Sequence, residues 1–160
     1  MTSAQTTILR AAKVAPGSTL AGVVAARANI FDMTQKAEAA VLRPRDSGAF
    51  CHALRAALAA RIAAQAGDKL LSEHYVADSG AFAPLANPEA DGAAQGLGVV
   101  LRFVDRVANQ TRDVASEDIA ALQEAGFGDA DIVRLCELVA FLAYQLRVVS
   151  GLRLMQGDAT

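Results

Sequence analysis

The chain is poor in the residues that build disulfide frameworks, metal centres and aromatic stacking platforms. Its 160 residues include no Trp, two Tyr, two Cys and two His, and aromatic residues make up only 5%. Cys51 and Cys136 are too far apart in sequence for a metal-binding or redox spacing, so we expect no metal, no other cofactor and no disulfide framework. This use of cysteine favours a reducing compartment and predicts a cytoplasmic protein.

The chain also lacks an excess of charge and a long apolar run. Fifteen basic residues face seventeen acidic ones, which gives a net charge of −2 and no electrostatic footprint for nucleic acid or an anionic membrane. The run 19–28 is the best candidate for a signal core, but Arg27 interrupts it. No apolar segment approaches the ~20 residues of a membrane span, so we expect neither secretion nor a membrane anchor.

What the chain does contain is alanine and other helix formers. Hydrophobic residues make up 53% of the chain, and 36 residues are Ala. Such a composition favours helices that pack at close range, and 160 residues suffice for one domain with its own core. The polar start and the Pro16-Gly17 break predict an N-terminal arm at 1–17, followed by a single all-α domain at 18–160.

Capping residues and breaks predict six or seven helices in that domain. Ser18 and Asp68 are N-cap residues, Gly67 is a stop signal, and Asn87 with Pro88 resembles a helix start. The segment 79–85 is punctuated by Gly and Pro and is predicted to be a loop. The expected helices begin at Thr19, at about Phe31, at Cys51, at Lys69, near Pro88 (interrupted at 92–98), after the Ser116 cap and at Asp129.

The C-terminal segment pairs a capped helix with a long apolar one. Ser116 is the predicted N-cap of the first helix, Gly126 ends it in a left-handed conformation, and Asp129 restarts the chain. The stretch 132–154 is apolar nearly all round, so we expect its helix to be enclosed by its own fold and by a partner subunit. This predicts a homo-oligomer, a dimer, trimer or hexamer.

The same segment resembles a known superfamily. Ala125, Gly126 and Phe127, followed by Asp129 and Ile132 and then a long apolar helix with Arg147 near its end, resemble the C-terminal part of the alkylhydroperoxidase D and carboxymuconolactone decarboxylase superfamily, in its peroxidase-related branch. The stretch 54–75 is similar to the central helix pair of that superfamily. The resemblance implies an alkylhydroperoxidase D-like helical bundle with peroxidase, that is oxidoreductase, activity.

The chain departs from the redox centre that the resemblance implies. Redox members carry C-x-x-C with a His four residues after the second Cys, and an acidic residue about three turns upstream. When His74 is placed on that His, the two cysteine positions fall on Gly67 and Leu70, and the acidic position falls at or beside Arg55. Thiolates are the nucleophiles of such a cycle, so we do not expect a working thiol peroxidase.

Two candidate reactive groups remain on the central helices. His74, with Tyr75 beside it, is a candidate acid or base, although a His on an apolar flank is more often structural. Cys51 is a candidate thiol beside His52, but adjacent helical residues point about 100° apart, which disfavours direct contact. Cys136 lies among apolar residues and is expected to be an inert small hydrophobe.

Two residues of the C-terminal helix are candidate substrate-binding groups. A helical wheel places Arg147 with Cys136 and Ala140, and a buried guanidinium there needs an acidic partner. A structural ion pair with Glu73, Glu137 or Asp105 is the alternative to carboxylate binding. Tyr144 is a candidate for the same pocket or for an interface.

Three functional classes follow from the sequence. The first is a peroxidase-related protein without its dithiol, which binds a small molecule or assists another enzyme. The second is an acid–base enzyme of decarboxylase or isomerase type, in which His74 moves a proton and Arg147 holds a carboxylate. The third is a purely structural interaction protein.

Overall fold

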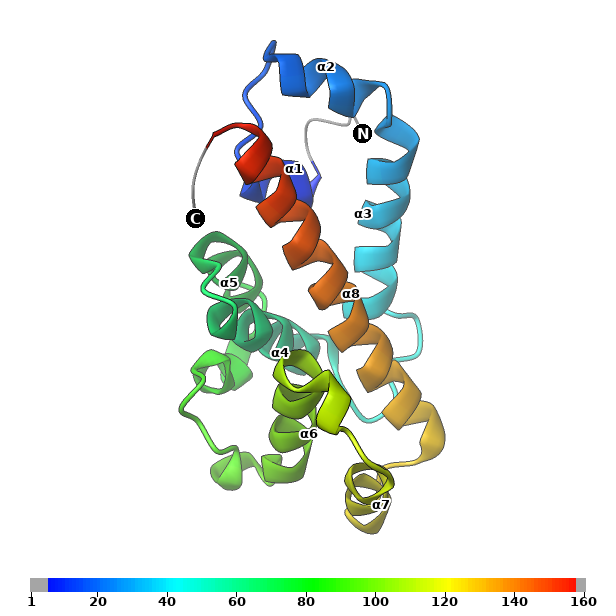
Figure 1. Ribbon diagram of the computed structural model, residues 1–160. Coiled ribbons are helices and arrows are strands. Elements are labelled where there is room, and N and C mark those ends of the chain that lie inside the picture. The colour runs from blue at the N-terminus through cyan, green and yellow to red at the C-terminus, as the bar shows by residue number, and fades with distance from the viewer. Residues whose placement is uncertain (1–5, 158–160) are drawn as a thin grey trace.

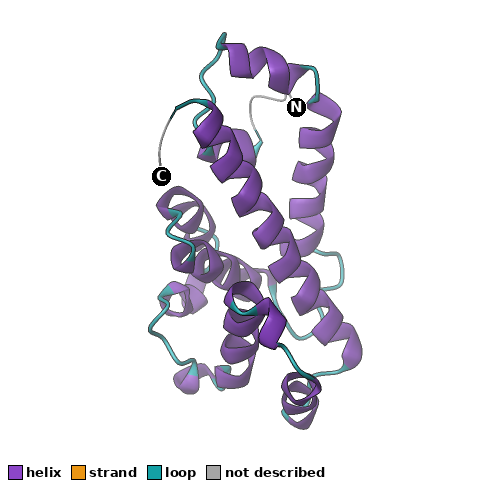
Figure 2. Ribbon diagram, in the orientation of Figure 1, coloured by secondary structure: helices purple, strands orange, loops and turns teal. Residues whose placement is uncertain are grey.

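The computed structural model describes residues 6–157 and confirms the all-α prediction. These residues form eight α-helices and three short 3₁₀-helices, with no strand among them (Figures 1 and 2). Seven of the α-helices follow the predicted arm. In chain order the elements are α1 (Thr7–Ala11), α2 (Thr19–Ala25), α3 (Ala28–Leu42), α4 (His52–Gln65), α5 (Lys69–Val76), η2 (Gly80–Ala86), η3 (Ala93–Gln95), α6 (Gly98–Asn109), η4 (Thr111–Asp113), α7 (Ser116–Glu124) and α8 (Asp129–Met155).

The predicted arm contains a short helix that packs into the core. Ile8 and Leu9 of α1 are buried, and α1 contacts α8. Near the end of α8, Arg153 Nη2 and Gln156 Nε2 donate to the carbonyls of Ala11 and Ala12 at 2.9 and 2.8 Å. Residues 6–14 therefore pack against the domain, while residues 1–5 of the arm lie outside the described part of the chain.

The helix that is enclosed on all sides is α4. Every residue from Leu54 to Ala63 is buried, because its many alanines let neighbouring helices approach from every direction. The long helix α8 runs diagonally across the molecule and packs against α1, α3, α4, α6 and α7 (Figure 1). It buries one face only, and residues such as Val133 and Leu154 on the other face are more than half exposed. This chain covers only one face of α8, so the expected cover of the other face by a partner subunit stays a prediction.

Several predicted helix boundaries are confirmed by hydrogen bonds and backbone angles. Ser18 Oγ accepts from the Ala21 N–H at 3.1 Å, and Asp68 Oδ1 accepts from the Leu71 N–H at 3.1 Å. Gly67 and Gly126 have φ angles of 75° and 93°, in the left-handed region where a Cβ is strained. These four residues set where α2 and α5 begin and where α4 and α7 end.

Three local predictions are wrong for identifiable reasons. Ser116 is the first residue of α7, and Asp118 supplies the cap instead by accepting from the Ala115 N–H at 2.9 Å. No α-helix begins at Pro88, because Asn87 Oδ1 closes a tight turn onto the Glu89 N–H and the next α-helix starts only at Gly98. The predicted loop 79–85 is largely the 3₁₀-helix η2.

Two buried arginines of α4 fix the loops around it. Arg61 makes a bidentate contact with Asp105 of α6, both distances 2.7 Å, and also donates to three carbonyls of the segment 85–88. Arg55 donates to the carbonyls of Val41, Ser47 and Phe50, and burial lowers the pKa of its guanidinium. These contacts hold the connection between α3 and α4 and the segment before α6 against the core.

The helices of the structure bear on the prediction that no segment is long and apolar enough to span a membrane. Within residues 6–157, no helix combines the length and the apolar character needed to cross a membrane, and this includes the 27-residue α8.

Candidate functional site

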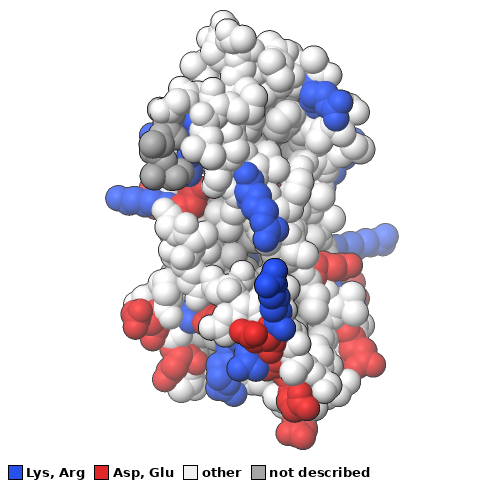
Figure 3. Space-filling model, in the orientation of Figure 1, with Lys and Arg blue, Asp and Glu red and all other residues white. Residues whose placement is uncertain are grey.

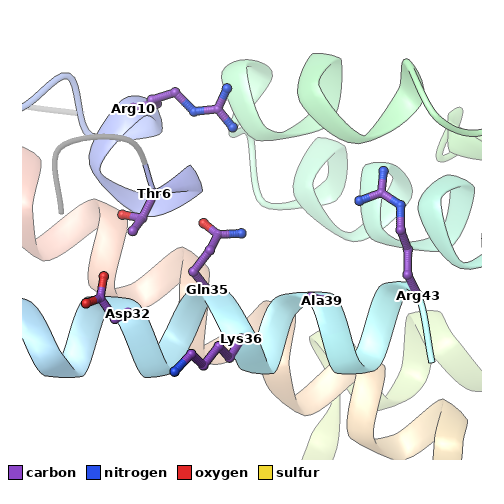
Figure 4. A pocket seen from close by; sticks show the side chains of 7 residues that line it. All are labelled: Thr6, Arg10, Asp32, Gln35, Lys36, Ala39 and Arg43. Atoms are coloured by element: carbon purple, nitrogen blue, oxygen red, sulfur yellow. The ribbon is translucent and has the colours of Figure 1, made fainter. Parts of the chain in front are cut away.

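A cleft lies between α3 and the elements that face it. It has a volume of about 870 Å³, within the range of small-molecule sites. Figure 4 shows α3 along one side, with Arg10 approaching from α1 and Arg43 reaching from the C-terminal end of α3 toward the facing helices. Gln35 points across the gap, and Lys36 lies along the outer side of α3. The lining residues are Thr6, Arg10, Asp32, Gln35, Lys36, Ala39 and Arg43.

A smaller pocket connects this cleft to α5. It has a volume of about 170 Å³ and is lined by Thr7, Arg10, Ala11, Leu70, Leu71 and His74. Arg10 lines both cavities and is the residue that they share. A third pocket, of about 150 Å³, shares Arg43 with the cleft and reaches Tyr75. Both of the predicted catalytic residues thus border cavities next to the cleft.

Behind these cavities lies a buried polar network centred on Glu38 of α3. Its Oε1 accepts from the Thr7 hydroxyl and its Oε2 from the Gln145 amide, both at 2.8 Å. Tyr75 donates its hydroxyl to Gln145 Oε1 at 2.6 Å. All four residues are buried, so the network ties α1, α3, α5 and α8 together at one point.

The direction of every hydrogen bond in this network follows from the chemistry. A flipped Gln145 amide would place its oxygen against the Glu38 carboxylate, so the amide nitrogen must face Glu38 and its oxygen must face Tyr75. Thr7 and Gln145 then each donate to one carboxylate oxygen. The arrangement suits an ionised Glu38 that accepts from neutral donors.

His74 lies at the exposed edge of the same network. Its Nε2 is 3.8 Å from Glu38 Oε1, which is an ion-pair distance when the imidazole is protonated but is too long for a hydrogen bond. The side chain is 35% exposed, whereas that of Glu38 is 7% exposed. His74 is therefore the more exposed of the two network residues, Thr7 and His74, that line the small pocket.

The cleft contains polar groups that the chain itself does not satisfy. Thr6 is buried, and its Oγ1 has no hydrogen-bond partner within residues 6–157. Arg10 has no carboxylate within ion-pair distance in that part of the chain, whereas Arg43 is paired with Asp78. The Thr6 hydroxyl oxygen has almost no exposed surface, so of these two groups it is the Arg10 guanidinium that a bound ligand would satisfy.

Arg147 and Tyr144 lie apart from this site. Arg147 is exposed and has no ion pair within the described chain, so the prediction of a buried guanidinium with an acidic partner is wrong. The wheel grouped it correctly with Cys136 and Ala140, but that face of α8 points outward. Tyr144 is 41% exposed, and its hydroxyl lies 3.0 Å from the Thr34 hydroxyl on α3.

The cysteines are separate from the site and from each other. Cys51 is exposed at the start of α4, and Cys136 lies in the middle of α8, where burial raises the pKa of its thiol. The His52 imidazole is not placed to act as a base for Cys51, because its Nε2 lies 3.0 Å from the Pro44 carbonyl oxygen instead. Gly67 lies in the turn between α4 and α5 and Leu70 lies inside α5; these are the positions on which the resemblance places the two cysteines. Within residues 6–157, no three His, Cys, Asp or Glu side chains are grouped to hold a metal ion.

Sequence reasoning missed Glu38, Gln145 and Arg10. The inward face of α3 follows the spacing Phe31, Thr34, Glu38 and Leu42, so an acid interrupts an otherwise apolar or small-residue stripe. That position was a usable signal, because a carboxylate on a core-facing helical stripe needs buried partners. Gln145 is the matching polar residue on the buried face of α8.

The ionisation of Tyr75 provides a test of the buried network. Burial, and next the nearby Glu38 charge, raise the pKa of the Tyr75 phenol well above its ordinary value of 10.0. A folded-state pKa above the unfolded one contributes stability that is complete below pH ~10 and is lost as the pH rises through the folded value. In a Tyr144→Phe variant, which retains Tyr75 alone, we expect phenolate absorbance to appear only well above pH ~10, together with unfolding. Ionisation near pH 10 in the folded protein would contradict the buried network.

Comparison of the chain with protein-family models, curated proteins and solved structures finds no match.

Proposed function

We propose that the protein binds a small organic anion in the cleft lined by α3 and α1, with Arg10 paired to the anionic group. The observation that carries this proposal is the position of Arg10, which lines both the large cleft and the pocket of His74 and has no carboxylate partner within residues 6–157. A guanidinium binds a carboxylate through two parallel hydrogen bonds, so a carboxylic acid is the ligand class that fits best.

The other cleft residues support a polar ligand of modest size. Gln35 supplies an amide, and the charged side chains of Lys36 and Asp32 also line the cleft. The cleft volume of about 870 Å³ accommodates a molecule of metabolite size. Because Gln35 Oε1 already accepts from the Thr7 N–H at 2.8 Å, its amide nitrogen remains available to donate.

Binding is preferred to thiol peroxidase chemistry for this site. A dithiol cycle needs two sulfur atoms that can close a disulfide, and the two free cysteines lie on α8 and at the start of α4, away from the cleft lining. Descent from a peroxidase-related protein remains part of the proposal, through the resemblance at 122–152. Two free thiols are also consistent with the proposed cytoplasmic location.

The contact between His74 and Glu38 favours acid–base chemistry as the second candidate function. The imidazole Nε2 faces the carboxylate, so Nδ1 is the nitrogen left to exchange a proton with a bound molecule. A proton taken from a carbon next to the ligand carboxylate would create an imidazolium, and Glu38 would stabilise that charge from 3.8 Å. In this scheme Arg10 takes the role that the sequence assigned to Arg147.

The binding proposal is tested with a panel of mono- and dicarboxylic acids, measured by calorimetry. We expect at least one acid to bind the wild-type protein, and we expect Arg10→Ala to weaken that binding by about tenfold or more, because the charge-assisted hydrogen bonds are lost. Arg27→Ala is the matched control, since Arg27 is an exposed arginine that lines none of the three pockets described above. Equal affinity in the Arg10 and Arg27 variants would contradict the proposal.

The acid–base candidate makes a separate prediction. If His74 removes a proton from a bound acid, the hydrogen next to the carboxylate exchanges with deuterium in D₂O, which NMR detects. We expect His74→Gln to slow this exchange by about 100-fold or more while the affinity for the acid changes little. If a bound acid shows no exchange above the rate in buffer, the protein binds this ligand without chemistry at His74.

A further inference from the structure

The outward face of α8 carries a regular stripe of exposed residues. Moving along the helix in steps of three and four residues, it consists of Ala130, Val133, Glu137, Ala140, Tyr144, Arg147, Gly151 and Leu154. We call these eight residues the α8 stripe. Val133, Tyr144 and Leu154 are 57%, 41% and 62% exposed. Alternating steps of three and four residues are the pattern of helices that pack against another helix along their length.

We propose that two copies of this chain pair antiparallel along the α8 stripe, with a two-fold axis at the level of Leu142. The stripe is symmetric in sequence about that residue. Glu137 lies five positions before Leu142 and Arg147 five positions after it, so each acid would face the partner's base. The interface would thus contain the same ion pair twice.

The remaining positions match large residues with small ones across the same axis. Tyr144 would face the partner's Ala140, Val133 would face the partner's Gly151, and Leu154 would face the partner's Ala130. Each large side chain therefore meets a position with little or no side chain, which lets the helix axes approach to the usual 8–10 Å. Complementarity in both charge and size is what identifies a second copy of the chain as the occupant.

Neither charge of the stripe is satisfied within one chain. Glu137 and Arg147 have no ion pair within residues 6–157, although eight ion pairs occur there. They are ten residues apart on one helix, a separation of about 15 Å, so they cannot reach each other. A two-fold partner brings each next to its counterpart.

Gly151 is an independent observation that points the same way. It lies inside α8, where glycine destabilises a helix, and a Cβ built on it would meet no atom within 4 Å. Nothing in its own chain therefore requires a glycine there. In the proposed dimer, the glycine leaves room for the partner's Val133 side chain to pack closely against the α8 backbone.

The surroundings of the stripe suit an interface of moderate size. Figure 3, seen from the side that α8 crosses, shows an upper half in which most residues are uncharged and Lys and Arg side chains are isolated, whereas most Asp and Glu lie in the lower half. The stripe is about 36 Å long, and the exposed Met33 of α3 lies beside Thr34, whose hydroxyl contacts that of Tyr144. One helix pair, with a small contribution from α3, buries less surface area than a standard protein–protein interface. We therefore expect a dissociation constant in the micromolar range.

Charge reversal in the full-length protein tests the proposal by sedimentation equilibrium. We expect the wild type to reach twice the 16.6 kDa chain mass at high micromolar concentration. Glu137→Arg and Arg147→Glu should each weaken this dimer by about tenfold or more, because each places like charges opposite each other. The double variant should restore dimerisation, since every pair is again opposite in sign. Glu124→Arg and Arg112→Glu, which make the same charge changes at exposed sites off α8, should have no effect.

A second variant separates pairing from folding. Gly151→Gln should stabilise the helix of the single chain, so the thermal midpoint of the monomer should not fall, while the new side chain blocks the partner's Val133 and weakens the dimer. A wild-type protein that stays monomeric at every concentration would overturn the proposal and leave the stripe to a different partner. Self-association that is insensitive to all three stripe variants, or that the double charge reversal fails to restore, would also overturn it.

Discussion

The structure depends on one carboxylate, Glu38, buried where four helices meet. A buried charge is costly unless its oxygens accept hydrogen bonds, and here the Thr7 hydroxyl and the Gln145 amide each occupy one oxygen. The donors come from α1 and α8. Tyr75 of α5 fixes the orientation of the Gln145 amide, because its hydroxyl donates to the amide oxygen. Moving any of the four helices would leave a buried polar group unsatisfied, so the network specifies how α1 and α3 dock on the rest of the fold.

The same requirement accounts for the form of the candidate site. Because Thr7 must reach Glu38, α1 lies against α3, and Arg10 is carried to the junction of the two cavities. Because Tyr75 must reach Gln145, α5 lies close enough to place His74 beside the carboxylate. Stability and proposed function thus rest on the same contacts. The α8 stripe lies on the opposite face of the helix that supplies Gln145, so pairing and ligand binding use different surfaces of α8.

Local signals in the sequence predicted the helices well, and long-range contacts could not be predicted. Ser18, Asp68 and Gly126 act within a few residues of their own positions, so their roles follow from sequence alone. The sequence names His74 and Tyr75 as candidates, but Glu38 lies 36 residues before His74, and only the packing of α3 brings Glu38 and His74 together. The prediction for Arg147 failed for a different reason. A helical wheel shows which residues share one face of a helix, but it does not show whether that face packs against the core.

The most direct test of this account is a double-mutant cycle between Glu38 and Gln145, measured by urea unfolding. Glu38→Met and Gln145→Met each leave a buried polar partner unsatisfied, and we expect each to cost about 2 kcal/mol or more. The double variant removes both groups, so its cost should fall short of the sum of the two single costs by at least ~1 kcal/mol. Additive costs, within about 0.5 kcal/mol, would show that the two residues are not coupled and would contradict the central role of Glu38.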